Sequence, residues 1–193
     1  MYNELHSNER LIWTEEARRN LFTCPIFSIR ESSCRSPDHE LRVFTVLDAP
    51  DWAIVVPVIE TEHGKAFVMV RQWRHGSQAL SLEFPGGVFE RGEDARSAAA
   101  RELQEETAYS AGKINKLGDF NPNPAIMSNK VHFFLAEDLD PLESQNLDDD
   151  EYVEVAVVPI NEVCRGMGKP PYIHALMGSA LMLYTLYQQN KAL

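Results

Sequence analysis

The chain has 193 residues, 44% of them hydrophobic, which is enough for one domain of ordinary size with a full core, or one domain and a small appendage. Its formal net charge of −11 argues against nucleic acid and anionic membrane surfaces as electrostatic partners. The three cysteines are scattered without a C-x-x-C spacing, which fits a reducing cytoplasm better than a disulfide framework.

The N-terminal part of the chain looks distinct from the rest. Its first ten residues contain no basic-then-apolar run, so no signal peptide is expected. Strand-like runs at residues 21–30 and 41–47 flank a polar, turn-rich segment and predict a small antiparallel sheet. Two short runs without a covering helix cannot bury much surface alone. We therefore expect a β segment over residues 1–50 that needs a partner surface, ahead of a main domain over residues 51–193.

The main domain alternates predicted strands and helices. The first two strands form a hairpin signal, with a glycine-containing turn between β-branched runs. A long acidic segment before the last strand reads as a loop. In chain order, we predict strands at residues 53–59, 66–72, 80–84, 113–120, 131–136 and 152–158, an acidic helix from about residue 94, a loop at 137–150, and helices at 161–166 and 173–190. The most apolar stretch, within the last helix, is too short to span a bilayer. The order predicts a mixed α/β (α+β) fold with a mixed sheet between helices.

The acidic helix is the most informative segment for function. Residues 87–109 read GVFERGEDARSAAARELQEETAY. On a helix, Glu102, Glu105 and Glu106 stand at positions i, i+3 and i+4 and share about one third of the circumference. Like charges repel at this spacing, so the cluster either faces solvent or holds a divalent cation. Oxygen ligands at this density suit Mg²⁺ or Mn²⁺ rather than zinc. For the three glutamates alone, the solvated face is the commoner interpretation.

The surrounding pattern resembles the Nudix box, G-x5-E-x7-R-E-U-x-E-E-x-G-U, in which U is aliphatic. Six fixed glycine or polar positions match, which happens by chance about once in 10⁷ windows. The matching residues are Gly87, Glu93, Arg101, Glu102, Glu105 and Glu106. Two positions depart from the pattern, Ala108 in place of glycine and Tyr109 in place of an aliphatic residue. Ala108 therefore either takes a left-handed conformation, at about 1 kcal/mol, or lets the helix run on.

The resemblance implies an α/β/α sandwich and a role for each residue of the box. It implies metal ligation by the Gly86 carbonyl and by the three helix carboxylates, Glu102, Glu105 and Glu106. It implies structural roles for Gly87, Glu93 and Arg101, where a bidentate Arg101–Glu93 pair would tie the loop to the helix. A tight turn is the alternative for the two glycines.

The catalytic groups follow from the same resemblance. They are Glu105, Glu106 and a glutamate from a loop near the last strand. Glu151 is the best positional match for that glutamate and Asp150 the second. A solvated acidic loop is the alternative for these two residues.

Two further segments resemble a narrower group, the ADP-ribose pyrophosphatase-like Nudix enzymes. VRQWR at residues 70–74 and LEFPGG at residues 82–87 stand where that group has V-R-Q-Y-R and L-E-x-P-A-G. The resemblance implies that Arg71, Arg74 and Glu83 bind substrate, the arginines through diphosphate oxygens. Surface pairing with the many acids is the alternative for both arginines.

The sequence thus predicts a cytoplasmic Nudix diphosphatase that depends on Mg²⁺, with Mn²⁺ as a second option. Its expected partner is a small nucleoside diphosphate derivative, not nucleic acid or a membrane. Cleavage of ADP-ribose to AMP and ribose 5-phosphate is the leading reaction. The alternatives are a nucleotide-sugar or dinucleotide diphosphatase, and a non-catalytic Nudix-fold nucleotide-binding module, against which the three intact carboxylates argue. The resemblance also implies a homodimer to which residues 1–50 contribute.

Overall fold

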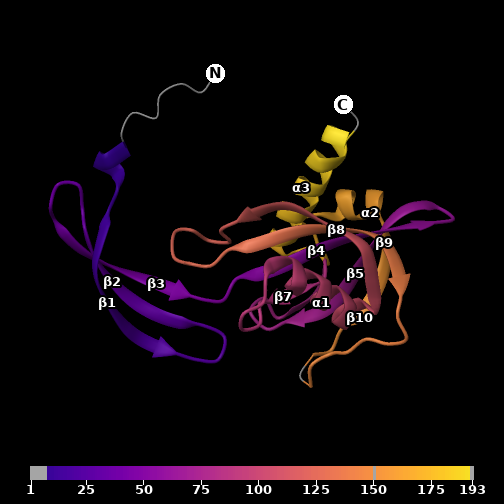
Figure 1. The fold of residues 1–193 in the computed structure, drawn as a ribbon, viewed down its shortest axis with the longest axis horizontal. Coiled ribbons are helices and arrows are strands. Elements are labelled where there is room, and N and C mark those ends of the chain that lie inside the picture. The colour runs from indigo at the N-terminus through magenta and orange to yellow at the C-terminus, as the bar shows by residue number, and fades with distance from the viewer. Residues whose placement is uncertain (1–7, 150, 192–193) are drawn as a thin grey trace. The chain divides into compact units, whose positions relative to one another are not determined.

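The computed structural model describes residues 8–149 and 151–191, which form two compact units (Figure 1). The first unit comprises Met1–Pro50 and Asn121–Asn129, and the second comprises Asp51–Phe120 and Lys130–Leu193. None of the helices in the described part of the chain has the length and apolar content needed to cross a bilayer.

The first unit is a three-stranded antiparallel sheet in the order β1-β2-β3, with strands at Thr14–Thr23, Ser28–Arg35 and Leu41–Asp48 after a short 3-10 turn at Asn8–Leu11. The predicted strand over residues 21–30 is wrong as a single element. The chain turns between Thr23 and Ser28, where Pro25 lacks the N–H that a continuing strand would need and the Cys24 N–H donates to the Phe27 carbonyl at 2.9 Å.

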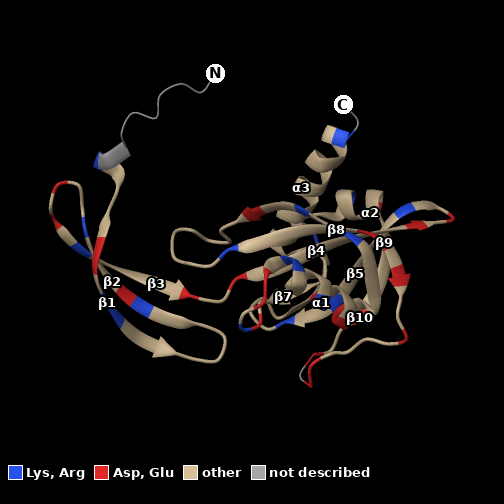
Figure 2. Cartoon of the chain, in the orientation of Figure 1, with Lys and Arg blue, Asp and Glu red and all other residues tan. Residues whose placement is uncertain are grey.

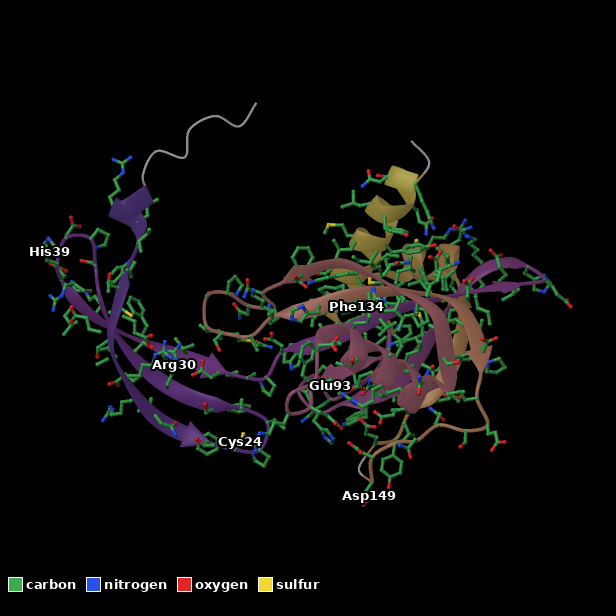
Figure 3. The ribbon with its side chains drawn as sticks, viewed as in Figure 1. Cys24, Arg30, His39, Glu93, Phe134 and Asp149 are labelled. Atoms are coloured by element: carbon green, nitrogen blue, oxygen red, sulfur yellow. The ribbon has the colours of Figure 1, made fainter. Side chains whose placement is uncertain are left out.

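Polar contacts rather than an apolar core tie the first unit together. Arg30, on the middle strand, binds Glu15 on β1 and Asp48 on β3, each at 2.6 Å (Figure 3). Among the described residues of this unit, only Ser32 and Asn129 are buried, and both are polar. Several large apolar side chains of this unit are exposed, among them Phe22, Ile26 and Phe44.

The second unit is built on a seven-stranded mixed sheet. Five strands follow the order β10-β5-β4-β9-β8, while β6 pairs with β5 and β7 pairs with β4. Only the β4–β9 pair is parallel within the described part of this sheet. The elements are β4 (Trp52–Thr61), β5 (Gly64–Arg74), β6 (Ala79–Glu83), β7 (Gly86–Val88), α1 (Ala95–Thr107), β8 (Tyr109–Phe120), β9 (Val131–Pro141), β10 (Glu154–Pro159), α2 (Ile160–Gly166) and α3 (Ala175–Lys191).

Successive residues of β4 point to opposite faces of the sheet, and each face packs against helices. Ala53 and Val55 join Leu103 of α1 in one apolar cluster. Ile54 and Val56 join a second cluster that includes Met177 and other residues of α3. Phe134 of β9 lies on the α1 side (Figure 3). Because side chains alternate along a strand, one central strand serves both cores. This confirms the predicted mixed α/β fold with a mixed sheet between helices.

Most predicted elements of the second unit are confirmed, with shifts at their ends. The β4–β5 hairpin forms as expected, with Thr61 paired to Gly64. The predicted loop over residues 137–150 is wrong in its first part, because β9 runs on to Pro141. There it pairs with β8 as far as Tyr109 opposite Pro141. Inter-strand pairing thus overrides the acidic composition of that stretch.

Candidate active site

Helix α1 is fixed at its start by a side-chain cap. The Asp94 carboxylate accepts the backbone N–H of Arg96 at 2.9 Å and of Ser97 at 3.1 Å. This capping satisfies two of the four N–H groups that a helix start leaves free, and it places the acid at the positive end of the helix dipole. Ala98, Ala99 and Leu103 of the helix pack against the sheet, while Glu102 and Glu106 lie against β7.

Two of the three glutamates are buried against the Gly86-Gly87 strand. Glu106 is 3% exposed, and its Oε2 accepts the Gly86 N–H at 2.8 Å. Glu102 is 7% exposed and lies so close to Gly87 that an added Cβ there would stand 2.4 Å from its Oε1. A Cβ on Gly86 would stand 2.2 Å from the Ala53 carbonyl oxygen. The two glycines belong to a strand, not a turn. Backbone leaves no room for a Cβ at Gly86, whereas a Cβ at Gly87 would displace the Glu102 carboxylate.

Burial of these carboxylates disfavours their ionised forms. It raises the pKa of Glu106 to about 8, although the Gly86 N–H opposes the shift. It raises the pKa of Glu102 to about 7, although Arg101 opposes the shift. The negative charge of Glu151 adds to both shifts after burial. A cluster of acids in this state gains free energy when a cation neutralises it.

Arg101 is the cationic side chain that bonds the acidic residues of this cluster. Its Nε and Nη2 each lie 3.1 Å from a Glu93 oxygen, so the expected bidentate contact is present. Its Nη1 also donates to Glu102 Oε1 and Glu105 Oε2, both at 2.8 Å, and Nη2 donates to the Val88 carbonyl at 3.0 Å. The arginine thus links the loop before the helix to two of the three candidate metal ligands, which the sequence analysis did not anticipate.

The residues fit a hard divalent cation in chemistry, although their side chains are not arranged as a finished site. Within residues 8–149 and 151–191, no group of three or more His, Cys, Asp or Glu side chains stands ready to hold a metal ion. Glu102 and Glu105 both bond Arg101 instead. The candidate donors are nonetheless all oxygen atoms, from carboxylates and one backbone carbonyl, which Mg²⁺ and Mn²⁺ prefer. Metal ligation by Glu102, Glu105, Glu106 and the Gly86 carbonyl stays a prediction.

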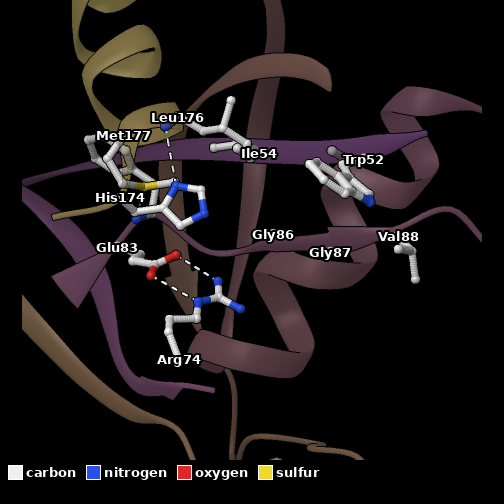
Figure 4. Close-up of a pocket in the computed structure, with 12 residues that line it drawn as sticks. Trp52, Ile54, Arg74, Glu83, Gly86, Gly87, Val88, His174, Leu176 and Met177 are labelled. Atoms are coloured by element: carbon white, nitrogen blue, oxygen red, sulfur yellow. Dashed lines mark hydrogen bonds and ion pairs between the residues drawn. The ribbon is translucent and has the colours of Figure 1, made fainter. Parts of the chain in front are cut away.

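A pocket of about 210 Å³ opens beside the glycine strand (Figure 4). Glu83, one of its lining residues, is fully buried and accepts two hydrogen bonds from Arg74, Nε to Oε1 at 2.9 Å and Nη2 to Oε2 at 2.6 Å. Burial alone would raise the pKa of Glu83, but the Arg74 hydrogen bonds and charge outweigh it and hold the pKa below its usual value. The pocket is lined by Trp52, Ala53, Ile54, Arg74, Glu83, Phe84, Gly86, Gly87, Val88, His174, Leu176 and Met177.

The other predicted site residues lie outside this pocket. Arg71 pairs with Glu154 of β10 at 3.1 Å on the surface. The loop before β10 carries several acidic residues (Figure 2). Glu151 is exposed in this loop, where its side chain accepts the Asp148 N–H at 3.2 Å. Asp150 lies outside the described residues. Substrate binding by Arg71 and catalysis by Glu151 stay predictions.

His174, Trp52 and Met177 line the pocket, and sequence reasoning missed all three. His174 precedes α3 directly, and its one sequence signal is a polar ring at the start of an otherwise apolar helix. Trp52 and Met177 carried no signal, because each reads as an ordinary core residue in an apolar run.

Comparison with known proteins agrees with this architecture. The family model of the NUDIX domain matches residues 49–177. An ADP-ribose pyrophosphatase of Bacillus subtilis (strain 168) is 33% identical over 150 residues, which cover 77% of this chain and 80% of that relative. A methanol dehydrogenase activator of Bacillus methanolicus is 34% identical over 108 residues, covering 55% of this chain and 58% of that relative. A crystal structure of an ADP compounds hydrolase shares the fold, with a TM-score of 0.80 at 21% identity over 93% of this chain and 95% of that chain. Since the family match spans more than half of the sequence and contains the whole glutamate helix, the chain belongs to the Nudix family of hydrolases.

Proposed function

We propose that this Nudix hydrolase cleaves the diphosphate of ADP-ribose to AMP and ribose 5-phosphate, with Mg²⁺ as its metal and Mn²⁺ as a substitute. The observation that carries the proposal is the pair of buried glutamates, Glu102 and Glu106, near a pocket in which the half-exposed Arg74 is ion-paired to the buried Glu83. The similarity to the Bacillus subtilis ADP-ribose pyrophosphatase supports the choice of substrate.

The glutamates of α1 would hold the metal. Glu106 is already oriented by the Gly86 N–H, while Glu105 and Glu102 would exchange their Arg101 contacts for the cation. When bound, a divalent ion neutralises diphosphate charge and lowers the pKa of an attacking water. Arg101 keeps its bidentate contact with Glu93 in this exchange, so the loop before the helix stays attached.

Residues around the metal would position the substrate. Arg74 presents its guanidinium to the pocket while Glu83 fixes its orientation, and a charge-assisted hydrogen bond from it would hold a diphosphate oxygen. Arg71, which lies on the surface outside the pocket, would contact a part of the substrate farther from the metal. Glu151, exposed in the loop before β10, would take the proton from water.

We further propose that the chain works as a homodimer in the cytoplasm. Residues 1–50 would form the dimer contact and contribute to substrate binding, and residues 51–193 would carry the hydrolase. Large apolar side chains of the first unit are exposed, including Phe22 at 53% and Ile26 at 69%. All three cysteines are free, as a reducing compartment requires.

A panel of diphosphates assayed with and without Mg²⁺ tests the proposal. ADP-ribose, an ADP-sugar, a GDP-sugar and a dinucleotide would be compared in wild type and in Glu106→Gln. We expect ADP-ribose to give the highest kcat/KM, no turnover without metal, and loss of turnover in the variant. Turnover by Glu106→Gln at the wild-type rate would refute the metal assignment, and a higher kcat/KM on another diphosphate would refute the substrate.

A further inference from the structure

His174 stands at the start of α3 and lines the pocket that holds Arg74 and Glu83. Its Nδ1 accepts the Leu176 backbone N–H at 3.2 Å, as a helix-capping side chain does. A ring nitrogen that accepts a hydrogen bond carries no hydrogen, so the neutral ring has its hydrogen on Nε2. The cap therefore fixes the tautomer of this histidine.

The Nε2–H is left free to bind something else. No hydrogen bond from Nε2 is made within the part of the chain that the structure describes, and Figure 4 shows that nitrogen on the opposite side of the ring from the Leu176 contact. Burial lowers the pKa of His174 below its ordinary value of 6.5, an effect that Glu83 opposes and Arg74 reinforces. At neutral pH the group is thus an uncharged donor.

Arg74 has a free donor on the same pocket. Its Nε and Nη2 both bond Glu83, which leaves Nη1 without a partner among the described residues and pointing away from Glu83 (Figure 4). A neutral N–H from His174, just before α3, and a charged N–H from Arg74 of β5 therefore line the same small pocket. Donors without acceptors favour a ligand that brings oxygen atoms and no hydrogen of its own to donate.

The size and position of the pocket indicate which part of the substrate it binds. At about 210 Å³ the pocket is smaller than the roughly 300–1,000 Å³ that a whole small-molecule site occupies, so it takes one portion of a substrate. Its wall includes Gly87, which packs directly on Glu102. Glu102, Glu105 and Glu106 do not line the pocket, but the charge of Arg74, which does, acts on Glu106. A diphosphate held between the metal ligands and Arg74 would place a phosphoryl group there.

We propose that His174 is a further substrate-binding residue, whose Nε2–H donates a hydrogen bond to a non-bridging phosphoryl oxygen that Arg74 Nη1 also contacts. This inference rests on the proposed diphosphatase function. It gives His174 two roles, since Nδ1 caps the start of α3 and Nε2 binds substrate.

Two substitutions separate these tasks. His174→Asn keeps an acceptor near the Nδ1 position, and asparagine is a strong helix cap, but its side chain is too short to replace Nε2. His174→Gln places an amide donor near the Nε2 position and weakens the cap. We expect His174→Asn to keep the wild-type melting temperature and lose about tenfold in kcat/KM, mainly through KM. His174→Gln should melt earlier and keep most of kcat/KM.

His63→Asn, in the exposed turn of the β4–β5 hairpin, is the matched control and should change neither quantity. The reverse pattern, with His174→Asn fully active and His174→Gln impaired, would show that His174 only caps the helix. Kinetics would be measured on whichever diphosphate the wild type cleaves best, so an error in the choice of ADP-ribose leaves the test intact.

Equilibrium binding of α,β-methylene-ADP, which has two phosphoryl groups and no terminal ribose, completes the experiment. A phosphoryl contact predicts about tenfold weaker binding of this probe to His174→Asn. Unchanged binding of the probe, with weaker binding of the methylene analogue of ADP-ribose, would place the contact on a sugar hydroxyl and overturn the proposal. This readout decides the role of His174 even if no diphosphate is turned over.

Discussion

At the scale of single residues, the buried glutamates make the stability of the metal-free protein depend on pH. The pKa of Glu106 is raised from 4.5 to about 8, and that of Glu102 from 4.5 to about 7, chiefly by burial. Between 4.5 and these raised values the folded chain holds more protons than the unfolded chain. Stability contributed by both groups is therefore present at low pH, falls as pH rises through this window, and levels off above it.

The prediction is a melting temperature of the metal-free protein that declines from pH 5 to pH 8, less steeply in Glu106→Gln. Glutamine keeps the Gly86 hydrogen bond and cannot ionise. Glu62→Gln, at an exposed hairpin position, is the control and should keep the wild-type slope.

Mg²⁺ should raise the melting temperature more at pH 8 than at pH 6, because its ligands must be deprotonated. Equal slopes in calorimetric scans of wild type and Glu106→Gln would contradict the burial argument.

The Arg74–Glu83 pair couples substrate binding to stability. Arg74→Ala should lower kcat/KM about ten- to a hundredfold, since it removes a charge-assisted hydrogen bond. It should also destabilise the fold by roughly 1–3 kcal/mol, because Glu83 stays buried without its partner. In Arg74→Ala/Glu83→Gln, stability should largely return while kcat/KM stays low. Urea unfolding and steady-state kinetics on the wild type and the two variants check this. If the double variant recovered kcat/KM together with stability, Arg74 would not be a substrate-binding residue.

The sequence indicated the residues of α1 because their chemistry is local. One helix spacing places Glu102, Glu105 and Glu106 together, and the contact between Arg101 and Glu93 follows from the same short segment. Burial is not local. The spacing cannot show that Glu106 is buried while Glu105 is partly exposed, since this depends on how β7 passes the helix. His174 was missed for the same reason, because only the packing of α3 brings it beside Arg74.

At the scale of elements, Ala108 decides how α1 ends. The helix stops at Thr107, and Ala108 takes the left-handed conformation with φ 56° and ψ 36°, while its N–H bonds the Gln104 carbonyl. Of the two alternatives open from sequence, the strained cap is therefore the one adopted. The segment after β9 secures this end, as Leu142 N–H donates to the Ala108 carbonyl at 2.7 Å and Asn146 N–H to the Glu105 carbonyl at 3.0 Å.

Ala108→Gly should stabilise the protein by about 0.5–1 kcal/mol. Glycine adopts the left-handed conformation without strain, and this gain exceeds the entropic cost of its greater freedom in the unfolded chain. Ala100→Gly, inside the same helix, should destabilise it by about 1 kcal/mol. Opposite shifts of the urea midpoint at constant m-value would confirm the contrast. Destabilisation by both substitutions would mean that Ala108 is not strained.

Other element boundaries escaped the sequence because pairing partners set them. The turn at Pro25 divides an apolar run that reads as one strand, and β9 extends into an acidic stretch because β8 is there to pair with it. Apolar alternation and β-branched runs predicted the hairpin and the central strands well, since those residues fill the two cores of the sheet. The acidic composition of residues 137–141 carried no comparable information about their neighbours.

At the scale of the whole molecule, the fold class followed from the order of strands and helices, but the assembly of subunits does not follow from one chain. The first unit has exposed aromatic and aliphatic side chains and no buried apolar residue among those described. Exposed apolar patches on a folded unit commonly mark association surfaces. The homodimer proposed above would cover them.

Light scattering at micromolar concentration should give twice the chain mass of 21.9 kDa. Phe22→Glu and Ile26→Glu should shift the mass toward the monomer, because each puts a charge into the proposed contact. Leu186→Glu, at an exposed apolar position on α3, should leave the dimer intact. Point substitutions are sharper than deleting the segment, since Leu47 bonds the backbone of Ile126 and Ser128, and a deletion would strip that support. A wild-type mass near 21.9 kDa would refute the dimer, and dimers in both charged variants would move the contact away from the first unit.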